Sequence, residues 1–456
     1  MFNFSQKHAK ITTFYILGRK IEDLSPKLRT NLRRKRPVLV IPTLATEFTT
    51  EENLPVFVNI LKQLSKVTYL SRIIFGLDAA TDEEALELAR LVKGCGIKNY
   101  IIQHNNGEGF SHLYTRLGEA GFQNDRPGKG RNMFMSFGVA QSVGAQCIGV
   151  LDADIRTFHR RQLDRLFYPV LALDYEFSKA FYARVAEGRM FGRVKRLLLD
   201  PLLLALKRKF SETGEDKFLR LVDFLLAFNY QLSGEVVFDT SLLKRMHFAT
   251  NWGVEIFTLI EVYRKANNIA QVQFSRLSFD HKHQAVSADE PDKGLNKMAI
   301  DIVTTILATL MVEEGLEITD YFTHDITATY LNVADELIKK YADNASFSEL
   351  LYDRNAEEAV VHNVFKNAIL SAGDYLISPF SLYDRLLRVL VSDKRFHKYL
   401  NTGLTDDLLA YQKENQSQLF EIPQTVSWDR IIMKLPKILN EIKEVTDREM
   451  VRFRKV

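Results

Sequence analysis

The chain has 456 residues, of which 46% are hydrophobic, so it is long enough for two or three domains with a sizeable buried core. This composition excludes global disorder. The formal net charge is only +4 and gives no support to nucleic-acid binding by the chain as a whole, so we expect no nucleic-acid partner.

Two cysteines, Cys95 and Cys147, are too few for a disulfide framework and indicate a reducing, cytoplasmic compartment. The N-terminus lacks the apolar stretch of a signal peptide, which favours the same compartment. The apolar runs 197–206 and 299–312 are too short to cross a bilayer, and each contains an aspartate. We therefore expect no transmembrane segment.

Residues 1–36 are basic and end in the run RRKR at 33–36. Such a run can bind an anionic membrane or partner, or it can be a solvated lead-in to the first strand. We favour the lead-in and treat 1–36 as a basic N-terminal extension.

From residue 37 onward, predicted strands alternate with predicted helices. The strands are VLVIPTL (38–44), RIIFGLD (72–78), residues 99–104 and residues 147–151. The helices are 53–66, a helix after the capping box Thr81-x-x-Glu84, and 129–143, while the polar, glycine-containing stretch 105–128 is expected to be a loop. This order predicts an α/β fold with a doubly wound, largely parallel sheet.

Two carboxylates, Asp152 and Asp154, follow the strand 147–151. Residues i and i+2 of a strand point to the same side, so both can reach one Mg²⁺ or Mn²⁺. A short Asp-x-Asp is often only a solvated turn. However, Asp78 and residues 42–44 also end strands, and ligands of such sheets bind beyond the carboxyl ends of the strands.

Lys129 stands between Gly128 and Gly130 at the start of a predicted helix. Glycines allow backbone amides to approach an anion, and the helix presents its positive end. The stretch is not a Walker A loop, and a glycine turn with a solvated lysine is the alternative. Its place one helix before Asp152 favours diphosphate binding.

This arrangement resembles the GT-A glycosyltransferases that make glucosyl- or mannosylglycerates. The resemblance continues through GRV (192–194), QLSGE (231–235), WGVEI (252–256) and DHKHQ (280–284), in the order that the family has them. Ser233 stands where the family has glycine, and Thr46 where it has an acidic residue. The resemblance implies a GT-A, Rossmann-like catalytic domain over 37–290.

Residues 291–456 lie outside the matched motifs and show helical periodicity, most clearly at 298–313, 327–341, 356–370 and 382–391. We expect a helical C-terminal domain there. It would pack on the catalytic domain or build a homodimer.

The resemblance also implies roles for individual residues. The nucleotide would contact Pro42, Thr43, Leu44, Glu47, Asp78, Lys129 and Asp152. Asp154 and His281 would bind the metal, with His283 as the alternative histidine. The catalytic carboxylates would be Glu255, Asp154 and Glu235, and the acceptor would contact Arg193, Lys195, Trp252 and His283.

These roles together imply an enzyme that uses Mg²⁺ or Mn²⁺ and retains the anomeric configuration. It would transfer glucose from a nucleoside-diphosphate sugar to 3-phosphoglycerate or a related glycerate, as in compatible-solute synthesis. Alternatives on the same fold are mannosylglycerate or glucosylglycerate synthesis. A sugar nucleotidyltransferase would show a glycine-rich, arginine-containing signature near its first strand, which VLVIPTLATEF lacks. A non-catalytic nucleotide-sugar-binding protein would not need Lys129, Asp154, Glu255 and His281 together.

Overall fold

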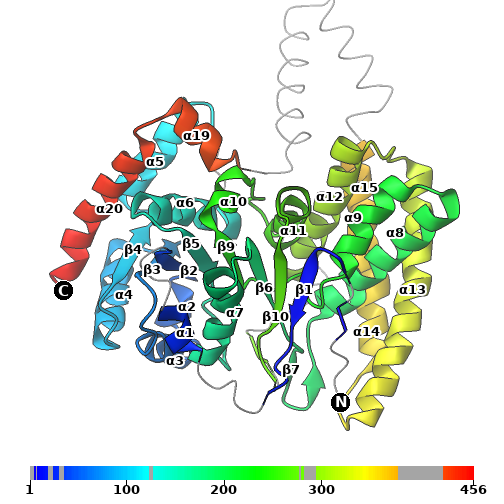
Figure 1. Ribbon diagram of the computed structural model, residues 1–456. Coiled ribbons are helices and arrows are strands. Elements are labelled where there is room, and N and C mark those ends of the chain that lie inside the picture. Colours follow the sequence, from blue (N-terminus) through cyan, green and yellow to red (C-terminus); the bar gives the residue numbers. More distant parts are fainter. Residues whose placement is uncertain are drawn as a thin grey trace, which may run out of the picture.

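The structure is a computed structural model that describes residues 5–6, 8–18, 24–29, 35–122, 127–276, 279–281, 294–377 and 425–456. Its centre is an eight-stranded sheet with the strand order β1-β10-β6-β9-β5-β2-β3-β4, against which helices pack (Figure 1). Only β9 runs antiparallel to its neighbours β5 and β6 in this sheet. The predicted α/β class with a largely parallel sheet is confirmed.

The strands of the main sheet are β1 (Ile11–Phe14), β2 (Pro37–Leu44), β3 (Arg72–Asp78), β4 (Tyr100–His104), β5 (Cys147–Val150), β6 (Phe177–Phe181), β9 (Val236–Asp239) and β10 (Ile269–Gln273). A small hairpin joins β7 (Val185–Ala186) to β8 (Arg189–Met190). Strands β2 to β5 match the four predicted strands, because buried parallel strands are apolar almost throughout.

The helices of the first half are α1 (Ser25–Arg29), α2 (Thr46–Thr49), α3 (Leu54–Leu64), α4 (Asp82–Gly94), α5 (Glu108–Glu119), α6 (Lys129–Ser142) and α7 (Arg160–Ala172). The capping box of α4 is present, since Thr81 and Glu84 bond to each other's backbone N–H. It satisfies two N–H groups that a helix start leaves without partners.

The second half contains the π-helix η1 (Val194–Leu199), α8 (Asp200–Thr213), α9 (Asp216–Leu226), α10 (Thr240–Arg245), α11 (Val254–Lys265), α12 (Gly294–Glu314), α13 (Asp320–Phe347), α14 (Arg354–Val360), the π-helix η2 (Val361–Phe365), α15 (Lys366–Ile377), α19 (Trp428–Lys434) and α20 (Ile438–Arg454). The predicted helices 298–313, 327–341 and 356–370 fall in α12, α13 and α14 to α15. The predicted helix 382–391 lies outside the described residues.

Two expectations about the first half were wrong. The stretch 105–128 is not a loop throughout, because α5 lies within it and buries Phe110, Leu113 and Leu117 at helical spacing. The extension 1–36 is not merely a lead-in, because β1 pairs in parallel with β10 at the edge of the sheet. The four-residue strand ITTF is too short for its alternation to stand out in the sequence.

The C-terminal region separates into two parts in Figure 1. Helices α12, α13 and α15 pack with α8, α9 and α11, near the β1 end of the sheet. Helices α19 and α20 lie at the other end, where α20 packs on α4, α5, α6 and β4 and α19 packs on α10 and α20. The division into 37–290 and 291–456 remains a prediction.

Among the described residues, one helix segment, Gly294–Val312 of α12, has the length and composition to cross a membrane. Its most apolar window is 61% buried inside the protein, and α12 packs against α11 and α15. Length and composition are therefore weak evidence for a membrane span here.

Candidate active site

Asp152 and Asp154 follow β5 at the carboxyl end of the sheet, as the sequence predicts. Lys129, the first residue of α6, places Nζ 2.7 Å from Asp152 Oδ1 and 2.9 Å from Glu255 Oε1. Burial alone would lower the pKa of Lys129, but the charges of Asp152 and Glu255 raise it well above its ordinary value. The structure thus joins three predicted site residues, Lys129, Asp152 and Glu255, around one positive charge.

The loop that carries Lys129 depends on glycine. A Cβ atom at Gly130 would lie 1.9 Å from the carbonyl oxygen of Ala249, so only glycine allows the two backbones to pack this closely. The segment 249–253 leads directly into α11, whose first turn carries Glu255. This contact brings the start of α6 beside the start of α11 and sets the separation between Lys129 and Glu255.

Backbone pairing places the side chain of His281 beside the acidic pair. Ile155 and His281 form an antiparallel bridge, and Arg156 donates its backbone N–H to the carbonyl oxygen of Asp280 at 3.0 Å. The His281 Nδ1 atom consequently lies 3.2 Å from Asp154 Oδ1.

Asp154 and His281 shift each other's pKa. Burial alone would raise the pKa of Asp154, but the hydrogen bond and charge of His281, helped by Lys129, hold it below its ordinary value. Burial alone would lower the pKa of His281, but Asp154 and Glu235 raise it. The pair therefore favours a carboxylate facing a positive charge.

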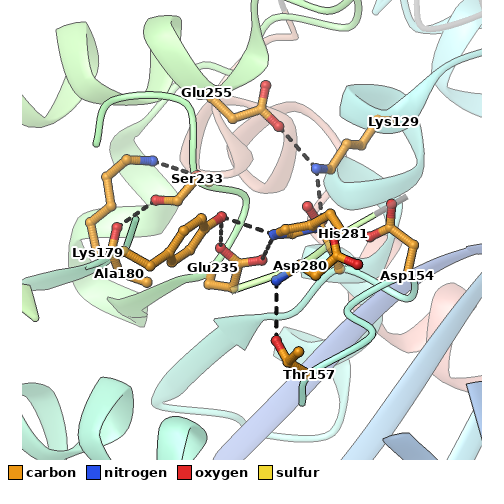
Figure 2. Close-up of polar contacts among 12 residues, drawn as sticks. Lys129, Asp154, Thr157, Lys179, Ala180, Ser233, Glu235, Glu255, Asp280 and His281 are labelled. Atoms are coloured by element: carbon orange, nitrogen blue, oxygen red, sulfur yellow. Dashed lines mark hydrogen bonds and ion pairs between the residues drawn. The ribbon is translucent and has the colours of Figure 1, made fainter. Parts of the chain in front are cut away.

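Glu235 lies behind His281 and is 0% exposed. One of its oxygens accepts a hydrogen bond of 2.8 Å from the Tyr182 hydroxyl, and the other lies 3.8 Å from His281 Nε2 (Figure 2). Burial and the charge of Asp152 raise the pKa of Glu235. This placement does not suit the predicted role of Glu235 as a carboxylate that touches the substrate.

The acidic residues and the histidine fit a divalent cation. Ligand atoms of Asp152, Glu235 and His281 lie within 4.8 Å of one another, and Asp154 adjoins the same histidine. Glu235 Oε1 is buried and has no hydrogen-bond partner among the described residues. Carboxylate oxygens with one imidazole nitrogen suit Mn²⁺, and the carboxylates suit Mg²⁺.

The predicted nucleotide residues lie at the ends of β2 and β3. Pro42 and Thr43 lie near the end of the strand β2, and Leu44, its last residue, is 47% exposed. Glu47 lies in α2 and is largely buried. Asp78 ends β3, where burial raises its pKa against the effects of Asn105 and Arg131.

Several residues around Asp78 escaped the sequence analysis. The Arg131 guanidinium lies 3.8 Å from the centre of the Tyr114 ring, whose hydroxyl donates to Asn105 at 3.0 Å. Asn132 donates to the carbonyl oxygen of Gly76 at 2.6 Å and so ties α6 to β3. Arg131 and Asn132 directly follow PGKG, which was the available signal.

Lys179 and Arg184 were also missed. Lys179 on β6 is 1% exposed, and its ammonium donates to the carbonyl oxygen of Ser233 at 2.5 Å. Burial lowers the pKa of Lys179 to about 8, against the charges of Glu255 and Glu235. The charge of Arg184 contributes to the lowered pKa of Asp154, so a further cation lies near the site.

The two cations among the predicted acceptor residues are held in ion pairs. Arg193 places Nε 3.3 Å from the buried Glu357, and Lys195 pairs with Asp200, so both cations already face carboxylates. Trp252 is 37% exposed just before α11. His283 lies outside the described residues, so its predicted role remains a prediction.

Two curated relatives resemble the chain over most of its length, although no protein-family model matches it. It is 35% identical over 377 residues to glucosyl-3-phosphoglycerate synthase of Persephonella marina, covering 82% of this chain and 90% of the relative. It is 30% identical over 370 residues to glucosyl-3-phosphoglycerate synthase of Methanococcoides burtonii, covering 80% and 88%.

Solved structures of glucosyl-3-phosphoglycerate synthase from Mycobacterium tuberculosis are more distant. The complex with Mn²⁺, UDP and glucosyl-3-phosphoglycerate is 21% identical, with a TM-score of 0.46 over 65% of this chain and 86% of that chain. The complex with Mn²⁺, UDP-glucose and phosphoglyceric acid is 22% identical, with a TM-score of 0.47 and the same coverage. The assignment therefore depends on the two sequence relatives, and by that likeness the chain belongs to the glucosyl-3-phosphoglycerate synthase family of glycosyltransferases.

Proposed function

We propose that this chain transfers glucose from a nucleoside-diphosphate donor to 3-phosphoglycerate in a reaction that depends on Mg²⁺ or Mn²⁺. The relatives from Persephonella marina and Methanococcoides burtonii are named for this synthesis. The observation that carries the proposal is the Lys129 ammonium, held between Asp152 and Glu255 beside the Asp154–His281 pair. These are the residues that the sequence motifs single out.

Lys129 is suited to bind the departing diphosphate. When the anomeric C–O bond breaks, negative charge develops on the nucleoside diphosphate, and a positioned cation stabilises it most where water is excluded. Lys129 is half-buried at the start of α6, where the backbone N–H groups of the helix also favour an anion. A bound Mg²⁺ or Mn²⁺, held by Asp154 and His281 with Asp152, supplies further positive charge to the phosphates.

Glu255 is the carboxylate that we place between acceptor and donor sugar. Its side chain is 15% exposed and is fixed by the ion pair with Lys129. It orients the acceptor hydroxyl, and in a reaction with retention the departing phosphate takes the hydroxyl proton. Glu235 does not contact the substrate in this proposal, because its side chain is buried behind His281.

The acceptor is an anion, and Arg193 and Lys195 lie in a cationic stretch suited to carboxylate or phosphate binding. Both now face carboxylates, Glu357 and Asp200. We propose that a phosphorylated glycerate competes with these carboxylates for the two cations. Free glycerate, with one charged group fewer, would compete less well.

We also propose a cytoplasmic homodimer. Cys95 and Cys147 are unpaired in the structure, in keeping with a reducing compartment. The helices of residues 294–377 offer the surface for the dimer. Light scattering during gel filtration tests the dimer, and a monomer mass at micromolar concentration would contradict it.

An acceptor and donor screen tests the proposed reaction. Purified protein with Mn²⁺ is expected to release UDP from UDP-glucose only when 3-phosphoglycerate is present, and NMR of the product is expected to show an α-glucosidic bond. Preference for a mannose donor or for free glycerate would indicate mannosylglycerate or glucosylglycerate synthesis. Pyrophosphate as product would indicate a nucleotidyltransferase, and donor binding without turnover a non-catalytic protein.

A further inference from the structure

Both ring nitrogens of His281 have partners on different sides (Figure 2). Nδ1 faces Asp154 Oδ1 at 3.2 Å, toward the acidic pair. Nε2 faces the Tyr182 hydroxyl at 3.1 Å, and Glu235 Oε1 lies 3.8 Å away. The ring therefore separates an outer side, next to the proposed cation site, from a buried inner side.

The inner side is closely packed. The Tyr182 ring packs against Phe279 with centroids 3.8 Å apart and against Tyr230 with centroids 4.8 Å apart. Tyr182 is only 7% exposed, and Glu235 is 0% exposed. The polar contacts of Tyr182 and Glu235 on this side are with each other and with His281.

The hydrogen atoms on this side can be assigned by counting donors. Glu235 as a carboxylate only accepts, so the 2.8 Å contact uses the single hydrogen of the Tyr182 hydroxyl. The hydroxyl oxygen must then accept from His281, which places a hydrogen on Nε2. In a neutral imidazole this leaves the lone pair on Nδ1.

The outer contact involves Nδ1 and the Asp154 carboxylate, which lie 3.2 Å apart. With no cation bound, a hydrogen on Nδ1 joins the two atoms, as in the positively charged ring described above. A divalent cation bound by both atoms would take the place of that hydrogen, while Nε2 keeps its own. A second hydrogen bond that fixes the ligating ring is a common feature of metal-binding histidines.

We propose that Tyr182 and Glu235 are positioning residues that hold His281 with Nε2 protonated and present Nδ1 to the catalytic cation beside Asp154. This inference rests on the proposed metal-dependent function. It assigns Glu235 an indirect role. In the competing arrangement Glu235 is itself a ligand, together with Asp152 and His281, whose ligand atoms lie within 4.8 Å of one another.

Direct Mn²⁺ binding separates these arrangements without any substrate. Free Mn²⁺ is measured by electron paramagnetic resonance during titration of wild-type protein, Tyr182→Phe and Glu235→Gln. We expect Tyr182→Phe to weaken Mn²⁺ binding ~10- to 100-fold, the usual range for such partners. Glu235→Gln is expected to weaken it less, because the glutamine oxygen still accepts from Tyr182.

Two controls accompany the titration. Tyr330→Phe removes another buried hydroxyl, which lies on α13 and donates to the carbonyl oxygen of Leu197 at 2.6 Å. This variant is expected to leave Mn²⁺ affinity unchanged. Asp154→Asn tests the proposed function separately. If Asp154→Asn leaves Mn²⁺ affinity unchanged, the cation site of the proposed function is wrong, whatever Tyr182 does.

The inference is overturned if Tyr182→Phe binds Mn²⁺ within twofold of wild type, or if Glu235→Gln weakens binding more than Tyr182→Phe. A measurement on wild-type protein covers the case in which a variant does not fold. In protein labelled with ¹⁵N-histidine and saturated with Mg²⁺, the His281 signals are assigned by their loss in His281→Gln. A hydrogen on Nε2 supports the inference, and a hydrogen on Nδ1 refutes it.

Discussion

The Lys129 ammonium lies 2.9 Å from Glu255 Oε1, although 126 residues separate the two in the chain. The same ammonium lies 2.7 Å from Asp152 Oδ1. One cation thus connects the helix that begins at the glycine loop, the acidic pair after β5 and the start of α11. A diphosphate that binds Lys129, as proposed above, would share this cation with both carboxylates.

Replacing Lys129 by methionine is expected to lower kcat ~10²- to 10³-fold, the range for removal of one donor that stabilises charge in a transition state. Steady-state kinetics with the glucose donor and 3-phosphoglycerate measure the effect. Lys207→Met is the matched control, because Lys207 on α8 pairs with Asp223 on α9 at the surface, with 47% of the lysine side chain exposed. Equal activity of the two variants would show that Lys129 has only a structural role.

Asp154→Ala is expected to abolish Mn²⁺-dependent activity while the protein stays folded. The side chain is 30% exposed at a loop rim, so its removal leaves no large cavity. Activity assays with Mn²⁺ and circular dichroism during heating measure the two effects. A large fall in Tm would instead mean that Asp154 mainly stabilises the segment around His281.

Gly234 provides a test of how the acidic pair is positioned. A Cβ atom at Gly234 would lie 2.4 Å from Asp152 Oδ2, so Gly234→Ala must displace this carboxylate. We expect weaker Mn²⁺ binding and at least ~10-fold lower kcat/KM, as for other displaced partners of a metal ligand. Gly118→Ala in α5 is the matched control, because a Cβ atom there meets no atom within 4 Å.

If Gly234→Ala binds Mn²⁺ as wild type does, the carboxylate position does not matter for the cation. Gly118→Ala should keep full activity and gain about 0.5–1 kcal/mol of stability, since alanine favours a helix interior over glycine. Urea unfolding of both variants gives the free energies of unfolding. The comparison separates the contact with Asp152 from the general effect of adding a methyl group.

Sequence patterns located β2 to β5 because apolar runs of strand length ended in turn residues or capping boxes. They missed α5 because its glycines and polar residues conceal the buried stripe formed by Phe110, Leu113 and Leu117. They missed β1 because a four-residue edge strand carries little periodicity. Pairing with β10, 258 residues away along the chain at Ile11 and Ile269, stabilises it instead.

The candidate site shows the same limit. Lys129, Asp154, Glu255 and His281 belong to short motifs, so the sequence alone could name them as candidates. Tyr182 gave no such signal, because its meaning depends on a contact with His281 across 99 residues of chain. Lys179 on β6 was missed for the same reason, since only the folded chain brings it to the carbonyl oxygen of Ser233.

The buried carboxylate of Glu261 predicts a pH dependence of stability. Burial alone would raise its pKa, but hydrogen bonds from His247 and Lys265 hold the pKa below its ordinary value of 4.5. A lowered pKa in the folded state means that ionised Glu261 stabilises the fold above pH 4.5. This contribution disappears as the pH falls from 4.5 through the lower, folded-state pKa.

Glu261→Gln is therefore expected to cost about 1–3 kcal/mol at pH 7, because it weakens charge-assisted hydrogen bonds. The difference from wild type should shrink when the pH is lowered below 4.5. Urea unfolding at pH 7 and at lower pH values measures both. A difference that stays constant across this range would mean that the charge of Glu261 does not stabilise the fold.

The C-terminal segment is expected to support the donor site through Trp428. This side chain is 0% exposed, stacks on Phe134 with centroids 4.7 Å apart, and occupies space that Gly138 leaves free. Nearby, Thr425 exchanges hydrogen bonds with the backbone of Phe248 at 2.7 and 3.1 Å. Phe248 directly precedes the segment that packs on the glycine loop of Lys129.

Trp428→Ala should thus cost about 3–5 kcal/mol of stability, as for other buried aromatic side chains, and should also raise KM for the sugar nucleotide. The second effect follows because a loosened 248–251 segment no longer fixes the loop around Lys129. Met433→Ala in the same helix is the control, since Met433 is 81% exposed and should affect neither quantity. Kinetics at a temperature where Trp428→Ala remains folded decide the point. An unchanged KM would mean that α19 stabilises the fold without supporting the donor site, because Lys129 would then hold its position without the contact between Thr425 and Phe248.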